Sequence, residues 1–167
     1  MTLSAQAKQN PGIQALPSAK DYVVSKFHTP RVAVVIPHYN YSEFIGDALL
    51  SVQQQTYANF TCVIVDDCST EAHFSVVSQE IAKLADNRFK LVRNPENLGQ
   101  IPSVYRGIEE TDAAFMAVLD PDDRYAPEFI ARMLAVHLNP LIFCPLVSCD
   151  QYLLKLGDGV ITATQGR

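Results

Sequence analysis

The most informative stretch of this sequence is Val32-Ala33-Val34-Val35-Ile36-Pro37-His38-Tyr39-Asn40. Its first five residues form a short apolar run rich in β-branched side chains, which is typical of a strand buried on both faces of a parallel sheet. Polar residues from His38 to Asn40 follow at once, so the strand ends in a loop that could bind a ligand. An amphipathic helix is predicted next, with apolar residues at helical spacing over 44–52 and Ser42 as its N-cap.

The alternation of strand and helix continues along the chain. Further apolar runs predict strands over 60–65, 88–93 and 115–119. Helical spacing predicts three more helices, with inward faces formed by Phe74, Val77, Ile81 and Leu84, by Ile101, Val104, Tyr105 and Ile108, and by Phe129, Ile130, Met133 and Leu134. A last apolar stretch, 141–154, favours a strand, and a turn at 157–159 precedes another over 160–162. This pattern predicts an α/β fold with an open, mostly parallel sheet flanked by helices.

Length and composition place limits on the domain organisation and on the partners. The chain has 167 residues, of which 48% are hydrophobic and 19% charged, and its formal net charge is −5. These values predict one packed globular domain, and the acidic balance argues against a nucleic-acid partner. Residues 1–30 are polar and rich in proline, so we interpret them as a leader or arm and 31–167 as the domain. We expect no transmembrane segment, because no apolar run approaches the length of a membrane span.

The cysteines and the amino terminus bear on the compartment. Cys62, Cys68, Cys144 and Cys149 form no C-x-x-C pair, which argues against a zinc knuckle or a thioredoxin-like site. The first 20 residues lack the apolar core of a secretory signal. We therefore expect a cytoplasmic protein, with peripheral association at a membrane left open.

Three polar clusters follow predicted strands, at 37–40, at Asp66-Asp67 and at 120–123. Ligands of open α/β sheets bind at the carboxyl ends of the strands. Carboxylates gathered at one edge repel one another unless a cation lies among them, and oxygen ligands favour Mg²⁺ or Mn²⁺ shared with phosphate oxygens. The chain has neither a P-loop nor a G-x-G-x-x-G motif. We therefore expect a metal-held nucleoside diphosphate.

Five motifs, taken in order, resemble those of family 2 glycosyltransferases, which are inverting enzymes with the glycosyltransferase A fold. The motifs are VVIPHYN at 34–40, SVQQQTY at 51–57, VDDCST at 65–70, ENLG at 96–99 and LDPDD at 119–123. The resemblance extends from residue 31 to about 160 and covers the donor-binding half of that family's domain. It implies transfer of a sugar from a nucleoside diphosphate donor, with UDP the expected nucleotide, to a saccharide or lipid-linked saccharide acceptor. It also implies an apparently truncated domain that transfers sugar poorly by itself.

The resemblance further implies roles for individual residues. The residues expected to bind the donor are Pro37, Tyr39, Asn40, Asp66, Asp67, Asn97, Gly99, Arg106 and Asp122. Within that set Asp67 would accept a hydrogen bond from the base, while Asp66 would support the turn, although these two roles could be exchanged. Asp120, Asp122 and Asp123 would form the metal-binding element for Mn²⁺ or Mg²⁺, with Asp123 a direct ligand.

The sequence departs from the family pattern at three places. Arg106 lies two positions away from the arginine that commonly approaches the donor, so it either substitutes for that residue or leaves the diphosphate with less help. His38 stands where the family commonly has a small residue such as Thr. The family's general base would lie well past Asp123; we expect it beyond Arg167 and assign it to neither Asp150 nor Asp158.

Simpler interpretations of the same residues remain open. The Asp66-Asp67 pair could end a strand and cap the next helix with Ser69 and Thr70, and 120–123 could be an ordinary turn. Single histidines such as His38 favour surface or packing roles. Other functions to weigh are a catalytically incomplete nucleotide-binding module, a phosphoacceptor receiver domain and a nucleotidyltransferase. The last two are disfavoured, because a whole strand–helix unit precedes the acid pair and no glycine-rich basic loop follows the first strand.

Overall fold

The computed structural model describes residues 29–148, 152–154 and 161–163. Its main sheet consists of four parallel strands, β1 (Val32–His38), β2 (Phe60–Asp66), β3 (Phe89–Arg93) and β4 (Phe115–Val118). The helices between and after them are α1 (Ile45–Gln53), α2 (Glu71–Leu84), α3 (Gln100–Glu109) and α4 (Phe129–His137). A short antiparallel pair, β5 (Tyr152–Leu154) and β6 (Ile161–Ala163), comes last. The predicted α/β fold is confirmed.

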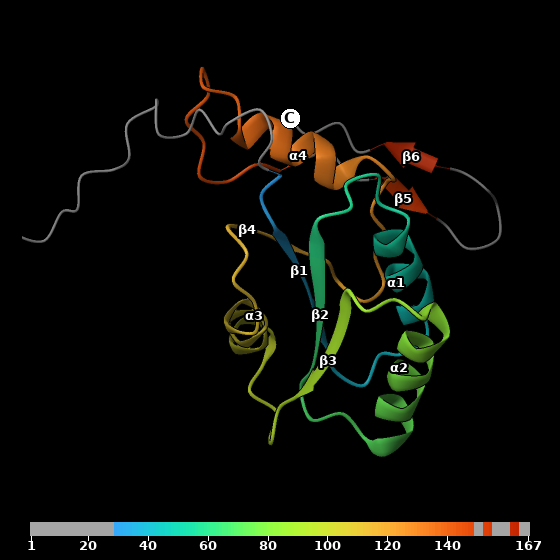
Figure 1. Ribbon diagram of the computed structural model, residues 1–167. Helices are drawn as coiled ribbons and strands as arrows, with labels where there is room; N and C mark the ends of the chain where they lie inside the picture. Colours follow the sequence, from blue (N-terminus) through green and yellow to red (C-terminus); the bar gives the residue numbers. More distant parts are fainter. Residues whose placement is uncertain (1–28, 149–151, 155–160, 164–167) are drawn as a thin grey trace, which may run out of the picture.

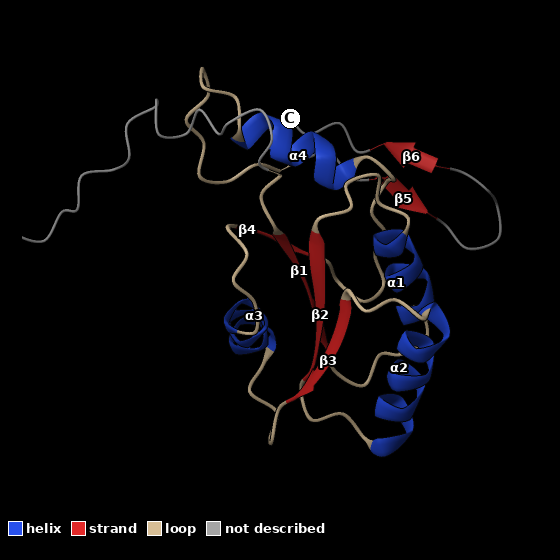
Figure 2. Cartoon of the chain, viewed as in Figure 1, coloured by secondary structure: helices blue, strands red, loops and turns tan. Residues whose placement is uncertain are grey.

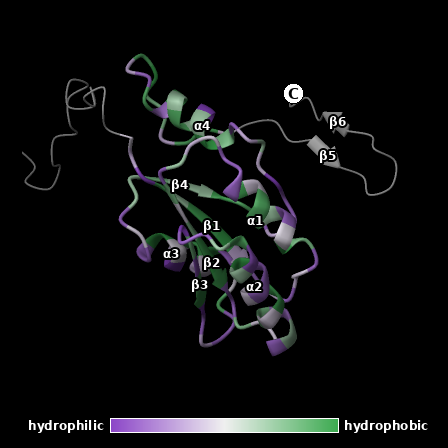
Figure 3. Cartoon of the chain, turned by 45° about the vertical axis from the view of Figure 1, so that its right-hand side comes forward, coloured by the Kyte–Doolittle hydropathy of each residue, from purple (hydrophilic) through white to green (hydrophobic). Residues whose placement is uncertain are grey.

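The sheet lies between two layers of helices. Helices α1 and α2 cover one face and α3 covers the other (Figures 1 and 2). Every residue of β1 is buried, which explains its continuous apolar sequence, and the strands form the hydrophobic centre visible in Figure 3. Helix α3 approaches the sheet closely at Gly107, where a Cβ atom would lie 2.4 Å from Cγ1 of Val35. A side chain at this position would push α3 away from the sheet.

The order of the strands determines where a ligand can bind. The chain runs outward from β1 through β2 to β3, and α3 then carries it back across the sheet to β4 on the other side of β1. The strand order therefore reverses at the boundary between β1 and β4. In open α/β sheets such a boundary leaves a crevice at the carboxyl ends of its two strands.

Two helix predictions need correction. Helix α1 begins at Ile45, and Ser42 is not its cap, because its hydroxyl lies 2.8 Å from Nδ1 of His73 instead. The predicted inward face of α3 is also partly wrong, since Ile101 and Tyr105 are 63% and 66% exposed. The buried residues of α3 are Ser103 and Gly107, and at Gly107 the sheet is too close for a larger side chain.

The carboxyl-terminal strand prediction is wrong over most of its length. Residues 141–148 form no strand, and Leu141 and Phe143 are 91% and 87% exposed. Pro145 interrupts this stretch and removes a backbone donor that a sheet would need. Strand β5 covers only the end of the predicted range; the predicted leader up to residue 28, Cys149, Asp150 and the turn at 157–159 lie outside the described residues. Within the described part, no helix is long and apolar enough to cross a membrane.

Candidate functional site

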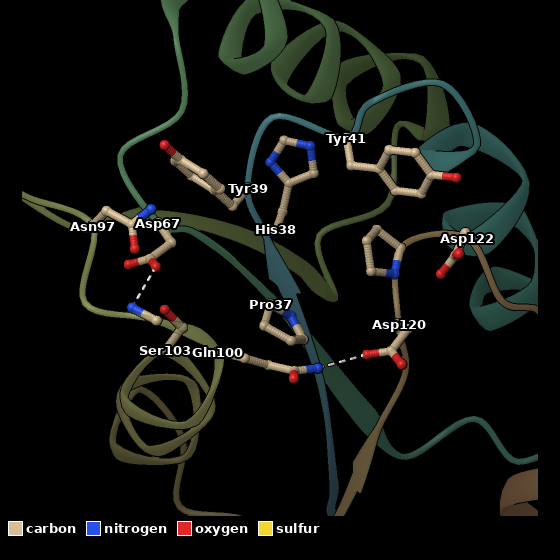
Figure 4. Close-up of a pocket in the computed structure, with 12 residues that line it drawn as sticks. Pro37, His38, Tyr39, Tyr41, Asp67, Asn97, Gln100, Ser103, Asp120 and Asp122 are labelled. Atoms are coloured by element: carbon tan, nitrogen blue, oxygen red, sulfur yellow. Dashed lines mark hydrogen bonds between the residues drawn. The ribbon is translucent and has the colours of Figure 1, made fainter.

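A pocket of about 390 Å³ opens at the carboxyl ends of β1 and β4 (Figure 4). Its walls come from the loops that follow β1, β2 and β4 and from the first turn of α3 with the loop before it. The predicted site residues that line it are Pro37, Tyr39, Asp67, Asn97, Gly99, Asp120 and Asp122. The predicted residues Asn40, Asp66, Arg106 and Asp123 lie outside this lining. The pocket therefore brings Asp67 of the first acidic motif together with Asp120 and Asp122 of the second.

Asp67 is held by donors from the protein itself. Its Oδ1 accepts hydrogen bonds from Nδ2 of Asn94 at 2.7 Å and the backbone N–H of Leu98 at 2.9 Å, and Oδ2 accepts one from the N–H of Gly99 at 2.7 Å. Burial alone would raise the pKa of Asp67. The hydrogen bonds from Asn94, Leu98, Gly99 and Ser103 outweigh that effect and leave its pKa below the ordinary value. Asp67 is thus a fixed, ionised acceptor at the pocket wall.

Arg106 reaches Asp67 only through an intermediate residue. Its Nη1 donates to Oδ1 of Asn94 at 2.8 Å, and the buried Asn94 amide donates in turn to Asp67 and to Oγ of Ser103. Arg106 therefore orients Asn94 from behind the pocket. Sequence reasoning gave Asn94 no role, although it lies directly after β3, at the same sheet edge as the acid pair.

Asp66 does not line the pocket and is completely buried. Its Oδ1 lies 3.0 Å from Nδ1 of His38, and its Oδ2 accepts the N–H of Ser69 at 3.1 Å and lies 3.3 Å from Nε of Arg93. Because a carboxylate can only accept, the Nδ1 atom of His38 carries the proton of this hydrogen bond. These contacts fasten the end of β2 to the end of β1 and to the turn before α2.

Asn40 joins two of the loops around the site. Its backbone N–H donates to Oγ of Ser69 at 2.9 Å, and its Oδ1 accepts the N–H of Thr70 at 2.9 Å. Its φ of 48° is left-handed, a conformation that asparagine tolerates better than most residues. The amide therefore binds the start of α2, and in this structure its contacts hold loops together.

The carboxylates of the acid loop, residues 120–123, receive fewer hydrogen bonds from the protein than Asp66 and Asp67 do. The N–H of Asp123 donates to the backbone oxygen of Asp120 at 3.0 Å, which forms a turn, and Nε2 of Gln100 donates to Oδ1 of Asp120 at 2.9 Å (Figure 4). Partial burial, followed by the negative charges of Asp122 and Asp120, raises the pKa of Asp123. Among the described residues no ion pair balances these carboxylates, since the adjacent Arg124 pairs with Asp47 on α1 instead.

The acid loop fits a divalent cation only in combination with other ligands. Among the described residues, no three His, Cys, Asp or Glu side chains form a group that could hold a metal ion. The loop nevertheless offers hard carboxylate oxygens, and the negative charges of Asp122 and Asp120 add to burial in raising the pKa of Asp123. Such a donor set suits Mn²⁺ or Mg²⁺ if oxygens of a bound phosphate complete the coordination.

Several residues of the pocket were not predicted to bind the donor: His38, Tyr41, Gln100, Ser103 and Pro121. The exposed Tyr41 follows Tyr39 by two residues in the same loop, which is a signal that the sequence did contain. Gln100 and Ser103 come directly after Gly99 in the first turn of α3. Their inward orientation depends on where α3 crosses the sheet, and no sequence pattern indicates that position.

Comparison with known proteins identifies relatives of this chain. The family model described as Glycosyl transferase family 2 matches residues 33–151. An uncharacterized glycosyltransferase of Haemophilus influenzae is 33% identical over 105 residues, which are 63% of this chain and 32% of that protein. TuaG of Bacillus subtilis, whose name assigns it provisionally to teichuronic acid biosynthesis, is 31% identical over 105 residues, 63% of this chain and 41% of its own. The matched part of the chain thus covers less than half the length of each of these relatives.

Solved structures agree with this relationship. TarS of S. aureus, residues 1–349 in complex with UDP, superimposes with a TM-score of 0.56 and 25% identity over 64% of this chain and 32% of that one. A mannosyltransferase of Pyrobaculum calidifontis, solved in complex with GDP-Man and Mn²⁺, has a TM-score of 0.55 and 23% identity, and the match covers 64% of this chain and 34% of that one.

These likenesses assign the sheet and its helices to the glycosyltransferase A fold. The receiver-domain and nucleotidyltransferase interpretations are excluded, because the matching family model covers the four-stranded sheet except for its first residue, Val32. The chain belongs to glycosyl transferase family 2.

Proposed function

We propose that this chain binds a nucleoside diphosphate sugar, with UDP as the nucleotide, in the pocket between the ends of β1 and β4. The protein that contains it would transfer the sugar to an acceptor hydroxyl with inversion of configuration. The observation that carries this proposal is the convergence of Asp67, Asp120 and Asp122 on one pocket at the point where the strand order reverses.

The nucleoside would lie at the end of the pocket that contains Asp67 and Tyr39. Asp67 is an ionised acceptor whose position is fixed by three short hydrogen bonds, so it can accept an N–H of the base. Tyr39 is 48% exposed at the pocket, where its ring could stack on a base. Structures of the relative TarS with UDP and with UDP-GlcNAc support uridine as the nucleoside.

The diphosphate would lie toward the acid loop. Asp120, Asp122 and Asp123 would hold Mn²⁺ or Mg²⁺ together with the diphosphate oxygens. When bound, the ion would supply positive charge that stabilises the departing nucleotide. The residues of the chain would contribute by fixing the carboxylates and the base, so that the sugar is presented at the open side of the pocket.

The acceptor is proposed more broadly, as a saccharide or a lipid-linked saccharide. TuaG carries a name that refers to the synthesis of a polysaccharide, which supports an acceptor of this class. We further propose a cytoplasmic location with peripheral contact to a membrane, which would place a soluble donor near a lipid-linked acceptor.

Calorimetric titration with UDP tests the proposal directly. We expect Mn²⁺ to tighten UDP binding. In Asp123→Asn, the affinity for UDP in the presence of Mn²⁺ should be at least about tenfold lower than in the wild type. The matched control is Asp112→Asn, which removes the same charge from an exposed carboxylate that lies 2.8 Å from Arg31 before β4, at the opposite end of that strand. The control should bind as the wild type does. Binding of UDP that is indifferent to Mn²⁺, or equal behaviour of both variants, would refute the metal-dependent site.

A further inference from the structure

The motif SVQQQTY at 51–57 contributes no residue to the lining of the pocket described above. It covers the end of α1 and the loop that follows, at the opposite end of α1 from the loop that enters it from β1. Within it, Ser51 and Gln55 are buried polar residues, 9% and 6% exposed, whereas Gln54 between them is exposed. Buried polar side chains are retained where they satisfy specific partners.

The partners of Gln55 belong to the chain segment that follows the acid loop. Its Nε2 donates to the backbone oxygens of Ser51 at 3.0 Å and Ala126 at 2.8 Å, and its Oε1 accepts the N–H of Ile130 at 3.0 Å. The N–H of Thr56 also donates to the backbone oxygen of Pro127 at 2.9 Å. Residue 55 thus binds a segment that is more than 70 positions away in the sequence.

Ser51 and Asp47 bind the same segment closer to the acid loop. Oγ of Ser51 accepts the N–H of Tyr125 at 3.1 Å, and Asp47 on α1 forms an ion pair with Arg124 at 3.1 Å. After the acid loop the chain therefore runs beside α1 until it reaches α4 (Figure 1). On the other side of the loop, the N–H of Leu119 donates to the backbone oxygen of Val35 at 3.0 Å.

The acid loop is consequently held at both ends, by β1 before Asp120 and by α1 after Asp123. The β1 contact belongs to the sheet, but the contacts with Ser51 and Gln55 are side-chain bonds that one substitution can remove. We propose that Ser51 and Gln55 are positioning residues, which set the place of Asp120, Asp122 and Asp123 and thereby control metal-dependent donor binding. This inference rests on the proposed function.

The test compares Gln55→Met with Gln54→Met in the full chain. Both replacements remove an amide of the same size, but only the first removes bonds to the segment after the acid loop. We expect Gln55→Met to weaken UDP binding in the presence of Mn²⁺ by about ten- to a hundredfold, because small displacements of charged groups have effects of this size. UDP binding without metal should change less than twofold, roughly the scatter of such measurements, and Gln54→Met should match the wild type in both conditions.

Hydrogen exchange supplies a readout that does not depend on a ligand. In Gln55→Met, peptides over 120–126 should exchange faster than in the wild type, while peptides from β1 and β2 should not. A merely structural role would lower stability throughout the chain and weaken UDP binding equally with and without Mn²⁺; that result would overturn the inference. If Gln55→Met does not fold, Ser51→Ala removes the acceptor for the N–H of Tyr125, together with a local donor to the backbone oxygen of Ala48 within α1. This variant should show the same split with a smaller loss.

The wild-type titration separates the two proposals. If wild-type binding of UDP does not depend on Mn²⁺, the proposed function itself fails. If it does depend on Mn²⁺ and Gln55→Met responds as the wild type does, the proposed function stands and the positioning role is wrong.

Discussion

The acid pair Asp66-Asp67 at the end of β2 and the acid loop 120–123 after β4 lie at the same edge of the sheet, but their charges are balanced differently. Both members of the pair are buried and accept hydrogen bonds from groups that belong to the fold. The loop is exposed apart from its half-buried Pro121, and within the described structure the donor to its carboxylates is the exposed amide of Gln100, which bonds Asp120. The carboxylates of the pair thus have their hydrogen-bond partners without a ligand, whereas those of the loop do not.

This difference distinguishes two kinds of carboxylate at one pocket: those that the fold itself satisfies, and those that a ligand would have to satisfy. Asp67 has a lowered pKa because its donors are part of the fold, whereas Asp123 has a raised pKa because of partial burial and the neighbouring charges. An acid that the protein already satisfies can fix the geometry of a site. An acid that the protein leaves unsatisfied can bind a cation, because the cation removes a repulsion that is otherwise permanent.

Removal of Asp66 should have the largest effect on stability. Asp66→Ala leaves His38, the N–H of Ser69 and Nε of Arg93 without their shared acceptor in a fully buried place. We expect the free energy of unfolding to fall by about 3–5 kcal/mol, measured by urea denaturation followed by circular dichroism. Asp122→Ala in the exposed loop should change it by no more than about 0.5 kcal/mol. Equal losses in the two variants would show that the pair and the loop are not built differently.

The two regions should also titrate in a fixed order as the pH falls. Because the pKa of Asp123 is raised, that carboxylate should take up its proton first, and the repulsion within the acid loop should decrease. Because the pKa of Asp67 is lowered, its stabilising contribution is present above the pKa of the unfolded chain and is lost only as the pH falls through its lower folded pKa.

Carboxyl ¹³C chemical shifts followed by NMR between neutral and acidic pH measure this order. Asp122→Asn is a useful comparison, since it removes one of the charges that raise the pKa of Asp123 and should bring that pKa down. The same substitution should leave the titration of Asp67 in place, because none of its donors is in the acid loop. Protonation of Asp67 before Asp123 would contradict the assignment of the two roles.

The elements that depend on local patterns were predictable from the sequence. Strand β1 is rich in β-branched residues because it is covered on both faces. The motifs at 34–40, 65–70 and 119–123 lie at the carboxyl ends of strands that meet at one edge of the sheet. The exposed face of β4 is different. Met116 and Val118 are 55% and 40% exposed, since β4 is an edge strand with one face uncovered in the described structure. An apolar run does not distinguish an edge strand from a central one.

The contacts behind the pocket could not be predicted in the same way. Asn94 lies between Arg106 and Asp67 only because α3 crosses back over β2 toward β1, and Gly107 sets how closely it does so. Gln55 binds Ala126 and Ile130 because the chain returns along α1 after β4. These bonds join residues that no periodic pattern relates, so their partners follow only from the tertiary structure.

The smallest effect is expected at the one bond that joins α3 to the acid loop in Figure 4. Gln100→Ala removes the neutral donor to Oδ1 of Asp120, but Gln100 and Asp120 are both exposed and water can replace the amide. The free energy of unfolding should therefore stay within about 0.5 kcal/mol of the wild type. UDP binding with Mn²⁺ should weaken by about threefold or less, since one exposed hydrogen bond contributes little. If Gln100→Ala lowered the free energy of unfolding as much as Asp66→Ala does, the fold would stabilise the acid loop as it stabilises the acid pair. The physical argument that the loop needs a cation would then fail.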